Sequence, residues 1–276
     1  MKANLFNYIP KDSPIHRLTG ATKLAALLLL SLASMTTFDT RFLLVVVILA
    51  FSMFFVSKIR FSEVKALLWI TFVFMVLNNA LIYLFEPEQG VMIYGTRHVL
   101  FTITKRYTVT AEQLFYHLNV ILKYLSMIPL VILFVSTTNP SEFAASLNRI
   151  GVNYKICYSV SLALRYIPDV QREYHDISVA LQARGMELTS KEKFVKRLKN
   201  VATILFPLIM TSMQRIEVVS NAMELRSFGK NKKRTWYVAN PFRKSDFFVF
   251  IICGMFMAVS LLLNLVNHGR YYNPFI

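Results

Sequence analysis

Residues 64–85 read VKALLWITFVFMVLNNALIYLF, a run in which Lys65 is the only charged residue. Its length is close to the ~20 residues that an α-helix needs to cross a bilayer. Further apolar stretches of similar length lie at residues 21–38, 41–57, 114–136 and 246–267. The sequence therefore predicts an all-α, polytopic membrane protein with about five transmembrane helices.

The composition of the chain supports this prediction. Hydrophobic residues make up 55% of the 276 residues and charged residues 17%, whereas a soluble domain averages about 45–50% and about 25%. The formal net charge is nevertheless +16, with 31 lysines and arginines against 15 acidic residues. The two cysteines, Cys157 and Cys253, are too few and too widely separated for a disulfide framework.

The basic residues are unevenly distributed about the predicted spans. If the N-terminus is cytoplasmic, most lysines and arginines fall in cytoplasmic segments, and Lys123 lies inside a span. The predicted external segments carry only Arg41, Arg97, Lys105, Arg106 and Arg270. Because loops rich in lysine and arginine stay in the cytoplasm, we expect a cytoplasmic N-terminus and an external C-terminus.

This orientation divides the chain into three parts. Residues 1–136 form an N-terminal cytoplasmic segment and four spans, residues 137–245 a cytoplasmic block, and residues 246–276 the final span and a short external tail. The middle block has a helical pattern but is too charged to span, so we expect amphipathic helices there. These are a short helix from the N-cap Asn139 to Gly151, helices at about 153–166 and 168–184 separated or kinked at Pro168, and a long helix at about 193–226, bent at Pro207.

Two similar heptapeptides close the last two of these helices. ALQARGM (180–186) and AMELRSF (222–228) align Arg184 with Arg226. Spacings of three and four residues put each arginine on the apolar stripe of its helix. One interpretation is that each guanidinium binds a partner's carboxylate in bidentate geometry. The alternative is that each cation only stabilises its helix dipole, by about 0.3–1 kcal/mol.

These residues carry a resemblance to a known family. The paired arginine motifs resemble those of the transmembrane coupling (T) component of energy-coupling factor (ECF) transporters, the CbiQ/EcfT family. SPIHRLTGATKL (13–24) is similar to the segment before the family's first span, and TTNPSEFAASLNRIGVN (137–153) to the segment after its fourth. The resemblance covers nearly the whole chain, and the arginine pair is its most specific part.

The resemblance implies a multi-pass subunit of a bacterial or archaeal cell membrane that holds two ABC-type ATPases and a membrane-embedded, substrate-binding S component. Arg184 would dock one ATPase and Arg226 the other, and ATP-driven movement would reorient the S component for vitamin or metal-ion uptake. The implied docking residues are Ala183, Arg184, Gly185, Leu225, Arg226 and Ser227. The second motif departs from the family by having serine where the first has glycine.

The long helix also carries a broad apolar stripe. Its predicted coupling surface, facing the S component or the membrane, comprises Phe194, Leu198, Val201, Leu205 and Leu208. Exposed apolar patches often mark interfaces. Packing on the chain's own spans or on lipid is an equally good explanation of the stripe.

Motifs of other functions are absent from the sequence. There is no P-loop and no GxSxG motif, and the scattered histidines show no metal-ligand spacing. We therefore expect no metal, no cofactor and no catalysis by this chain. Its basic runs lie beside spans without a recognition motif, which favours anionic lipid of the bilayer over nucleic acid as their partner. Alternatives to the T component are the permease of a conventional ABC transporter, an intramembrane enzyme and a membrane scaffold without a transport role.

Overall fold

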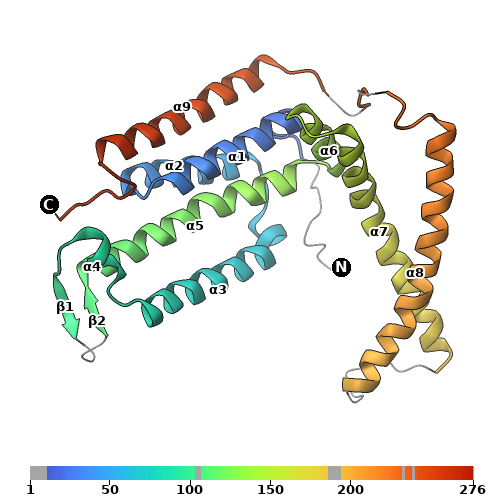
Figure 1. The fold of residues 1–276 in the computed structure, drawn as a ribbon, viewed down its shortest axis with the longest axis horizontal. Helices are drawn as coiled ribbons and strands as arrows, with labels where there is room; N and C mark the ends of the chain where they lie inside the picture. The colour runs from blue at the N-terminus through green and yellow to red at the C-terminus, as the bar shows by residue number, and fades with distance from the viewer. Residues whose placement is uncertain (1–10, 103–106, 186–193, 232–233, 238–239, 276) are drawn as a thin grey trace. The chain divides into compact units, whose positions relative to one another are not determined.

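The structure is a computed structural model that describes residues 11–102, 107–185, 194–231, 234–237 and 240–275 (Figure 1). For residues 194–200 it describes the backbone alone. Helices account for most of the described chain, and several are long and apolar enough to cross a membrane. The prediction of an all-α polytopic membrane protein is confirmed.

The elements follow one another mostly as helices joined by short connections. The helices are α1 (Gly20–Thr36), α2 (Thr40–Val56), α3 (Phe61–Phe85), α4 (Gln89–Tyr94), α5 (Ala111–Thr137), α6 (Pro140–Arg149), α7 (Tyr154–Ala183), α8 (Phe194–Leu225) and α9 (Lys244–Val266). A small antiparallel hairpin of β1 (Val99–Thr102) and β2 (Thr108–Thr110), which the sequence did not predict, precedes α5. The chain divides into two compact units, residues 1–146 with 239–276, and residues 147–238.

The five predicted spans correspond to α1, α2, α3, α5 and α9. The last three are long and apolar enough to cross a membrane. Helices α1 and α2 have 17 residues each, or about 25 Å of helix, slightly less than the ~30 Å hydrocarbon layer. Val201–Leu225 of α8 also meets the length and composition of a span, although its hydropathy of 1.3 is lower than the 2.0 to 2.5 of the other three.

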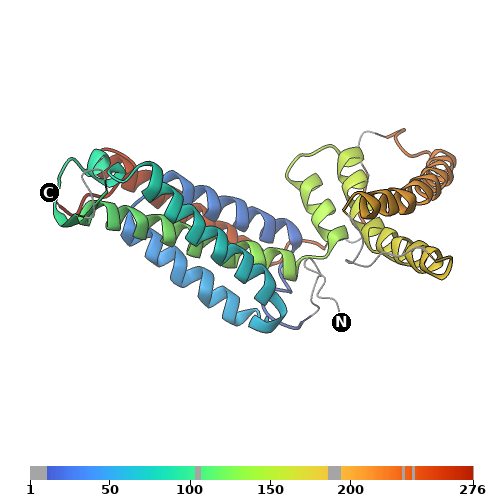
Figure 2. The same ribbon diagram turned by 90° about the horizontal axis from the view of Figure 1, so that it is seen from below.

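Small side chains allow the apolar helices of the first unit to pack closely. Helix α1 lies along α9 and helix α2 along α5 (Figures 1 and 2). Ala26 and Leu30 of α1, Ala50 of α2 and Leu130 of α5 share one buried cluster. Within a membrane, small interface residues let helix backbones approach and gain van der Waals contact, because lipid supplies no hydrophobic driving force between helices.

The two stretches that resembled the family outside the arginine motifs, residues 13–24 and 137–153, meet at one end of this bundle. Gly20 begins α1, and its backbone N–H donates to Oε1 of Glu142 in α6 over 2.7 Å. A Cβ on Gly20 would lie 2.7 Å from the Glu142 Cγ, so glycine is required for this approach. This contact joins two stretches that lie more than a hundred residues apart in the sequence and that both resemble the family.

Three further hydrogen bonds hold the same end of the bundle together. The backbone N–H of Thr19 donates to Oδ1 of Asp246, at the start of α9, over 3.0 Å. The same carboxylate accepts the backbone N–H of Arg243 over 2.7 Å, while Nζ of Lys23 donates to the Thr137 carbonyl over 2.9 Å. Buried polar groups must be paired to avoid a desolvation cost, so these contacts fix the starts of α1 and α9 and the end of α5.

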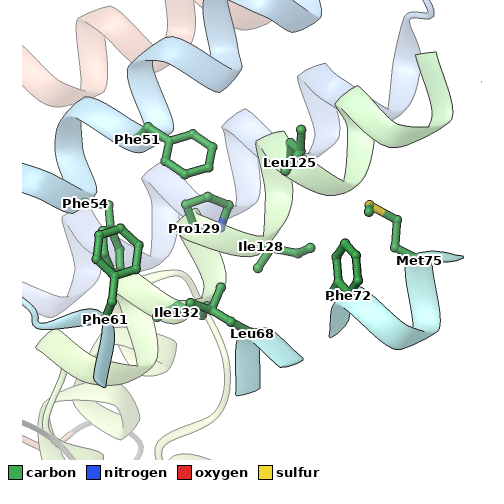
Figure 3. A pocket seen from close by; sticks show the side chains of 10 residues that line it. All are labelled: Phe51, Phe54, Phe61, Leu68, Phe72, Met75, Leu125, Ile128, Pro129 and Ile132. Carbon is green, nitrogen blue, oxygen red and sulfur yellow. The ribbon is translucent and has the colours of Figure 1, made fainter. Parts of the chain in front are cut away.

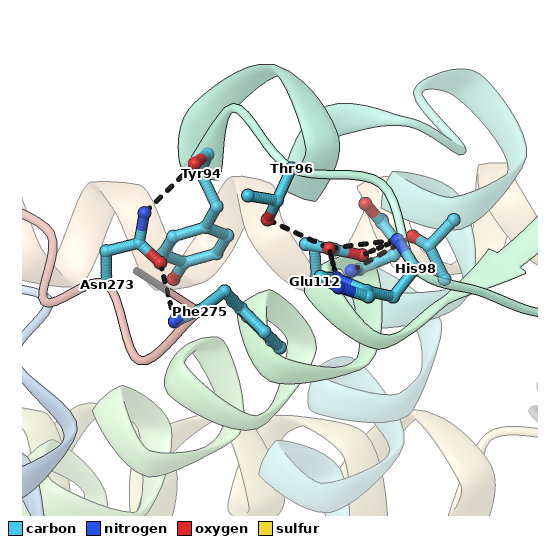
Figure 4. A network of polar contacts seen from close by, with 8 residues as sticks. Tyr94, Thr96, His98, Glu112, Asn273 and Phe275 are labelled. Carbon is cyan, nitrogen blue, oxygen red and sulfur yellow. Dashed lines mark hydrogen bonds and ion pairs between the residues drawn. The ribbon is translucent and has the colours of Figure 1, made fainter.

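A buried carboxylate organises the opposite end. Glu112, in the first turn of α5, is fully buried and accepts hydrogen bonds from the hairpin connection (Figure 4). Its donors are the Thr96 hydroxyl at 2.9 Å, the His98 backbone N–H at 3.0 Å and the His98 ring nitrogen Nδ1 at 2.6 Å. The network attaches the β-hairpin to the helix that follows it.

The C-terminal tail covers this network. The Asn273 side chain donates to the Tyr94 carbonyl over 2.9 Å, and the Phe275 ring lies 5.8 Å from the His98 ring (Figure 4). Nearby, Asp39 lies in the connection between α1 and α2, and its buried carboxylate accepts hydrogen bonds from Arg41 and from Asn267. Burial raises the pKa of Asp39, but hydrogen bonds from Arg41 and from the α9 end outweigh it and leave the pKa below its usual value.

The helices around residues 137–184 partly follow the prediction. Asn139 Oδ1 accepts the Ser141 N–H at the start of α6, and Gly151 follows its end with φ +111°, as expected. The predicted separation of two helices at Pro168 is wrong, because α7 continues through it from Tyr154 to Ala183; the alternative, a kink at Pro168, stays a prediction. Proline removes only one hydrogen bond from a helix interior, and contacts with α8 beside it keep the helix intact.

Candidate functional site

Helix α7 ends at the first predicted docking motif. Arg184 is its C-cap, with φ −86° and ψ 12°. Gly185 follows with φ +84°, and its backbone N–H donates to the Gln182 carbonyl over 2.9 Å. Ala183, Arg184 and Gly185 are all exposed. The left-handed conformation at Gly185 is one that glycine adopts without a steric penalty, and it leaves the arginine at an open helix tip.

Helix α8 ends with the same geometry at the second motif, despite its different sequence. Ser227 takes φ +53°. Its N–H donates to the Glu224 carbonyl over 2.8 Å, and the Phe228 N–H to the Met223 carbonyl over 2.9 Å. This pair of bonds is a Schellman motif. Serine therefore occupies the left-handed position that glycine fills in the first motif, and Leu225, Arg226 and Ser227 are exposed.

Because Ser227 carries a Cβ in a left-handed conformation, replacing it with glycine should stabilise the chain. We expect Ser227→Gly to raise the free energy of unfolding by a few tenths to about 1 kcal/mol, since the residue already sits where glycine is preferred. Thermal unfolding in detergent measures this change. Ser220→Gly, within the helix, is the control and should destabilise by about 0.5–1 kcal/mol; equal effects of the two changes would contradict the assignment.

Aromatic contacts fasten the second motif to the start of α7. The Phe228 ring lies 4.8 Å from the Tyr158 ring and 5.7 Å from the Tyr154 ring. Arg234 stacks over Phe228 at 5.5 Å, and its guanidinium donates to the Arg226 carbonyl over 3.4 Å. These contacts of Phe228 were not predicted from the sequence. A hydrophobic residue directly after a helix C-cap was the available signal.

The two helices of the second unit are antiparallel and cross each other (Figure 1). At the crossing, Arg215 of α8 forms an ion pair with Glu173 of α7 at 2.9 Å, and its guanidinium lies over the Tyr166 ring at 5.6 Å. Ile204 and Leu208 of α8 are buried in this unit. These contacts hold the pair at its centre and leave both C-terminal ends open.

The two arginines therefore lie far apart. Phe228 places the end of α8 against Tyr158, near the start of α7, whereas Arg184 is at the other end of α7. The helix from Tyr158 to Ala183 is roughly 40 Å long at about 1.5 Å per residue. A small domain is about 30 Å across, so the two arginines have room for separate protein partners.

The predicted coupling surface on α8 is only partly open. Leu205 is exposed, Val201 is half-buried and Leu208 is buried. Phe194 and Leu198 lie outside the residues whose side chains are described. A more exposed apolar stripe continues along the helix from Leu205 through residues that were not predicted from the sequence. This stripe, named here the α8 apolar face, consists of Leu205, Phe206, Ile209, Met213 and Ile216.

Comparison with known proteins identifies the family. A family model described as "CbiQ: Cobalt transport protein" matches residues 11–237. The chain belongs to the CbiQ family. The match begins before α1 and includes both arginine motifs, and it confirms the family predicted from the sequence. Within the described residues, no cluster of three histidine, cysteine, aspartate or glutamate side chains could hold a metal ion.

Curated relatives of this CbiQ-family chain match most of its length. Each of the following is named energy-coupling factor transporter transmembrane protein EcfT. The protein of Bacillus selenitireducens is 27% identical, over 92% of this chain and 94% of its own. That of Thermanaerovibrio acidaminovorans is 29% identical, over 85% and 86%. That of Thermotoga maritima is 25% identical, over 96% and 93%. The CbiQ-family chain is thus similar to transporter components over most of its length.

Proposed function

We propose that this chain is the T component of an ECF importer, a non-catalytic subunit that docks two ABC-type ATPases through Arg184 and Arg226. The observation that carries the proposal is the pair of exposed arginines, each at a helix C-terminus of the same geometry, roughly 40 Å apart. If each arginine only stabilised its helix dipole, the two would not need to lie so far apart. The names of the relatives favour a T component over a conventional permease or a scaffold.

The proposed mechanism is the transmission of motion through crossed helices. With a cytoplasmic N-terminus and an external C-terminus, α7 and α8 lie on the cytoplasmic side. Each guanidinium enters a groove of one ATPase and meets a carboxylate there. When the ATPases close on ATP, the two helix ends move relative to each other, and the Arg215–Glu173 contact at the crossing carries that movement along both helices.

The α8 apolar face is the proposed contact with the S component. Its side chains are more than 40% exposed and lie at helical spacings on one side of α8. Exposed apolar stripes of this kind mark interaction sites. Movement of α8 then tilts the S component and turns its vitamin or metal-ion site toward the cytoplasm.

A single acidic substitution on the α8 apolar face should weaken binding of the S component and leave binding of the ATPases unchanged. We expect Met213→Glu to reduce the co-purified S component by about tenfold or more, because a desolvated carboxylate is costly in an apolar contact, while the ATPases remain bound. The measurement is quantitative mass spectrometry of the purified complex. Gln214→Glu adds the same charge about 100° around the helix and should retain both partners. Loss of the S component in neither variant, or equally in both, would contradict the assignment of the face.

A further inference from the structure

An apolar groove of about 200 Å³ lies between α2, α3 and α5 (Figure 3). Phe54 of α2, Phe61 and Phe72 of α3, and Ile128 of α5 point into it. All ten side chains that line it are apolar. In a membrane-spanning region, such a space is filled by hydrocarbon or by a partner's side chains, because water gains no hydrogen bonds there.

The groove is open because α3 packs loosely. Helix α3 contacts mainly α5. Of its 25 residues, all of which the structure describes, only Val64, in the first turn, is buried. Its neighbour α2 lies against α5 as well, so the space between α2 and α3 is not filled by the part of the chain that the structure describes. The groove begins at Phe61, immediately beside the connection between the two helices.

This connection is strongly basic. Lys58, Arg60 and Lys65 are exposed within one turn of the groove's mouth. The nearby Glu63 carboxylate already binds Nζ of Lys11 at 2.6 Å and the Arg60 backbone N–H at 3.0 Å. The described part of this end therefore presents a surplus of positive charge, on the side predicted to be cytoplasmic.

We propose that the groove binds one acyl chain of an anionic phospholipid from the cytoplasmic leaflet, and that Lys58, Arg60 and Lys65 bind its phosphate headgroup. Basic pockets between transmembrane helices on the cytoplasmic side bind such headgroups. The groove suits an acyl chain better than a partner helix. A helix with its side chains is about 10–12 Å wide, too large for a space of about 200 Å³, and an apolar helix would not bind the cations at the mouth. The lipid fixes α3 against α2.

The proposal is tested on the full chain, expressed with its partners and reconstituted with phosphatidylglycerol that carries a photoreactive group in one acyl chain. We expect cross-links to residues of the groove, and competition by unlabelled phosphatidylglycerol but not by phosphatidylcholine. Lys58→Ala with Arg60→Ala removes two exposed charges while keeping all the side chains that line the groove, and should reduce cross-linking about tenfold. Ile128→Trp fills the groove with all charges intact and should abolish it.

Lys230→Ala with Lys244→Ala removes the same charge from exposed positions elsewhere and should leave cross-linking unchanged. Three outcomes would overturn the proposal: equal cross-linking in the test and control pairs, equal competition by phosphatidylcholine, or cross-linking of the photoreactive lipid to the S component in place of the groove. The Lys58→Ala with Arg60→Ala variant keeps the test valid if Ile128→Trp does not fold.

Discussion

Replacing both Arg184 and Arg226 by glutamate should leave the chain inserted in the membrane but free of its ATPases. Both side chains are exposed at helix ends, so neither change removes a contact that the fold requires. Losing one member of a buried charge pair at an interface costs about 2–5 kcal/mol. Because each ATPase loses one such contact, its affinity should fall by a factor of roughly thirty or more. The measurement is the amount of ATPase that co-purifies with the tagged chain.

Single variants and a matched control sharpen this result. Arg184→Glu and Arg226→Glu alone should each weaken retention, and the double variant should reduce it to background. Arg165→Glu with Arg172→Glu makes the same change of charge at exposed positions along α7, away from the helix tips, and should retain the ATPases in full. ATPase retention and transport by the double variant at the level of the unaltered chain would refute the docking roles.

The second large effect concerns stability. Glu112→Ala removes a fully buried carboxylate and leaves the Thr96 and His98 donors without their acceptor. Because hydrogen bonds to a charged group each contribute about 1.5–3 kcal/mol, and the variant loses those from Thr96 and His98, we expect a loss of about 3 kcal/mol in the free energy of unfolding. This corresponds to a decrease of roughly 6–12 °C in the midpoint of thermal unfolding.

Glu88→Ala provides the control, because Glu88 lies in the same part of the chain, between α3 and α5, and pairs with Arg97 at an exposed site. An exposed pair contributes about 0–1 kcal/mol, so its removal should shift the midpoint little. Thermal unfolding of the two variants in the same detergent gives the comparison. Equal shifts would mean that the network around Glu112 does not hold the hairpin.

The sequence predicted the features that depend on periodicity and composition. The apolar runs gave α1, α2, α3, α5 and α9 within a few residues. The helix from Asn139 to Gly151 could also be predicted, because an Asn-Pro start and a glycine end act locally. The arginine motifs stood out because both arginines fall on apolar stripes, where a charge is unexpected.

The remaining features depend on contacts between distant residues. Glu112 looks like an ordinary acid at a helix start, and only the folded hairpin buries it. The predicted separation of two helices at Pro168 was wrong because local sequence cannot show that α8 supports the helix around the proline. The left-handed Ser227 was equally hidden, since serine seldom takes that conformation, and the Phe228 contacts that accompany it come from the start of α7.

Site-specific photo-cross-linking tests the docking proposal most directly. Photoreactive residues at Ala183 and Leu225 would stand beside the two arginines at exposed helix tips, and one at His175 would stand exposed along α7. In membranes that contain the partners, both tip positions should cross-link to ATPase and His175 should not. Cross-linking of neither tip to an ATPase, or of His175 as strongly as the tips, would contradict the account.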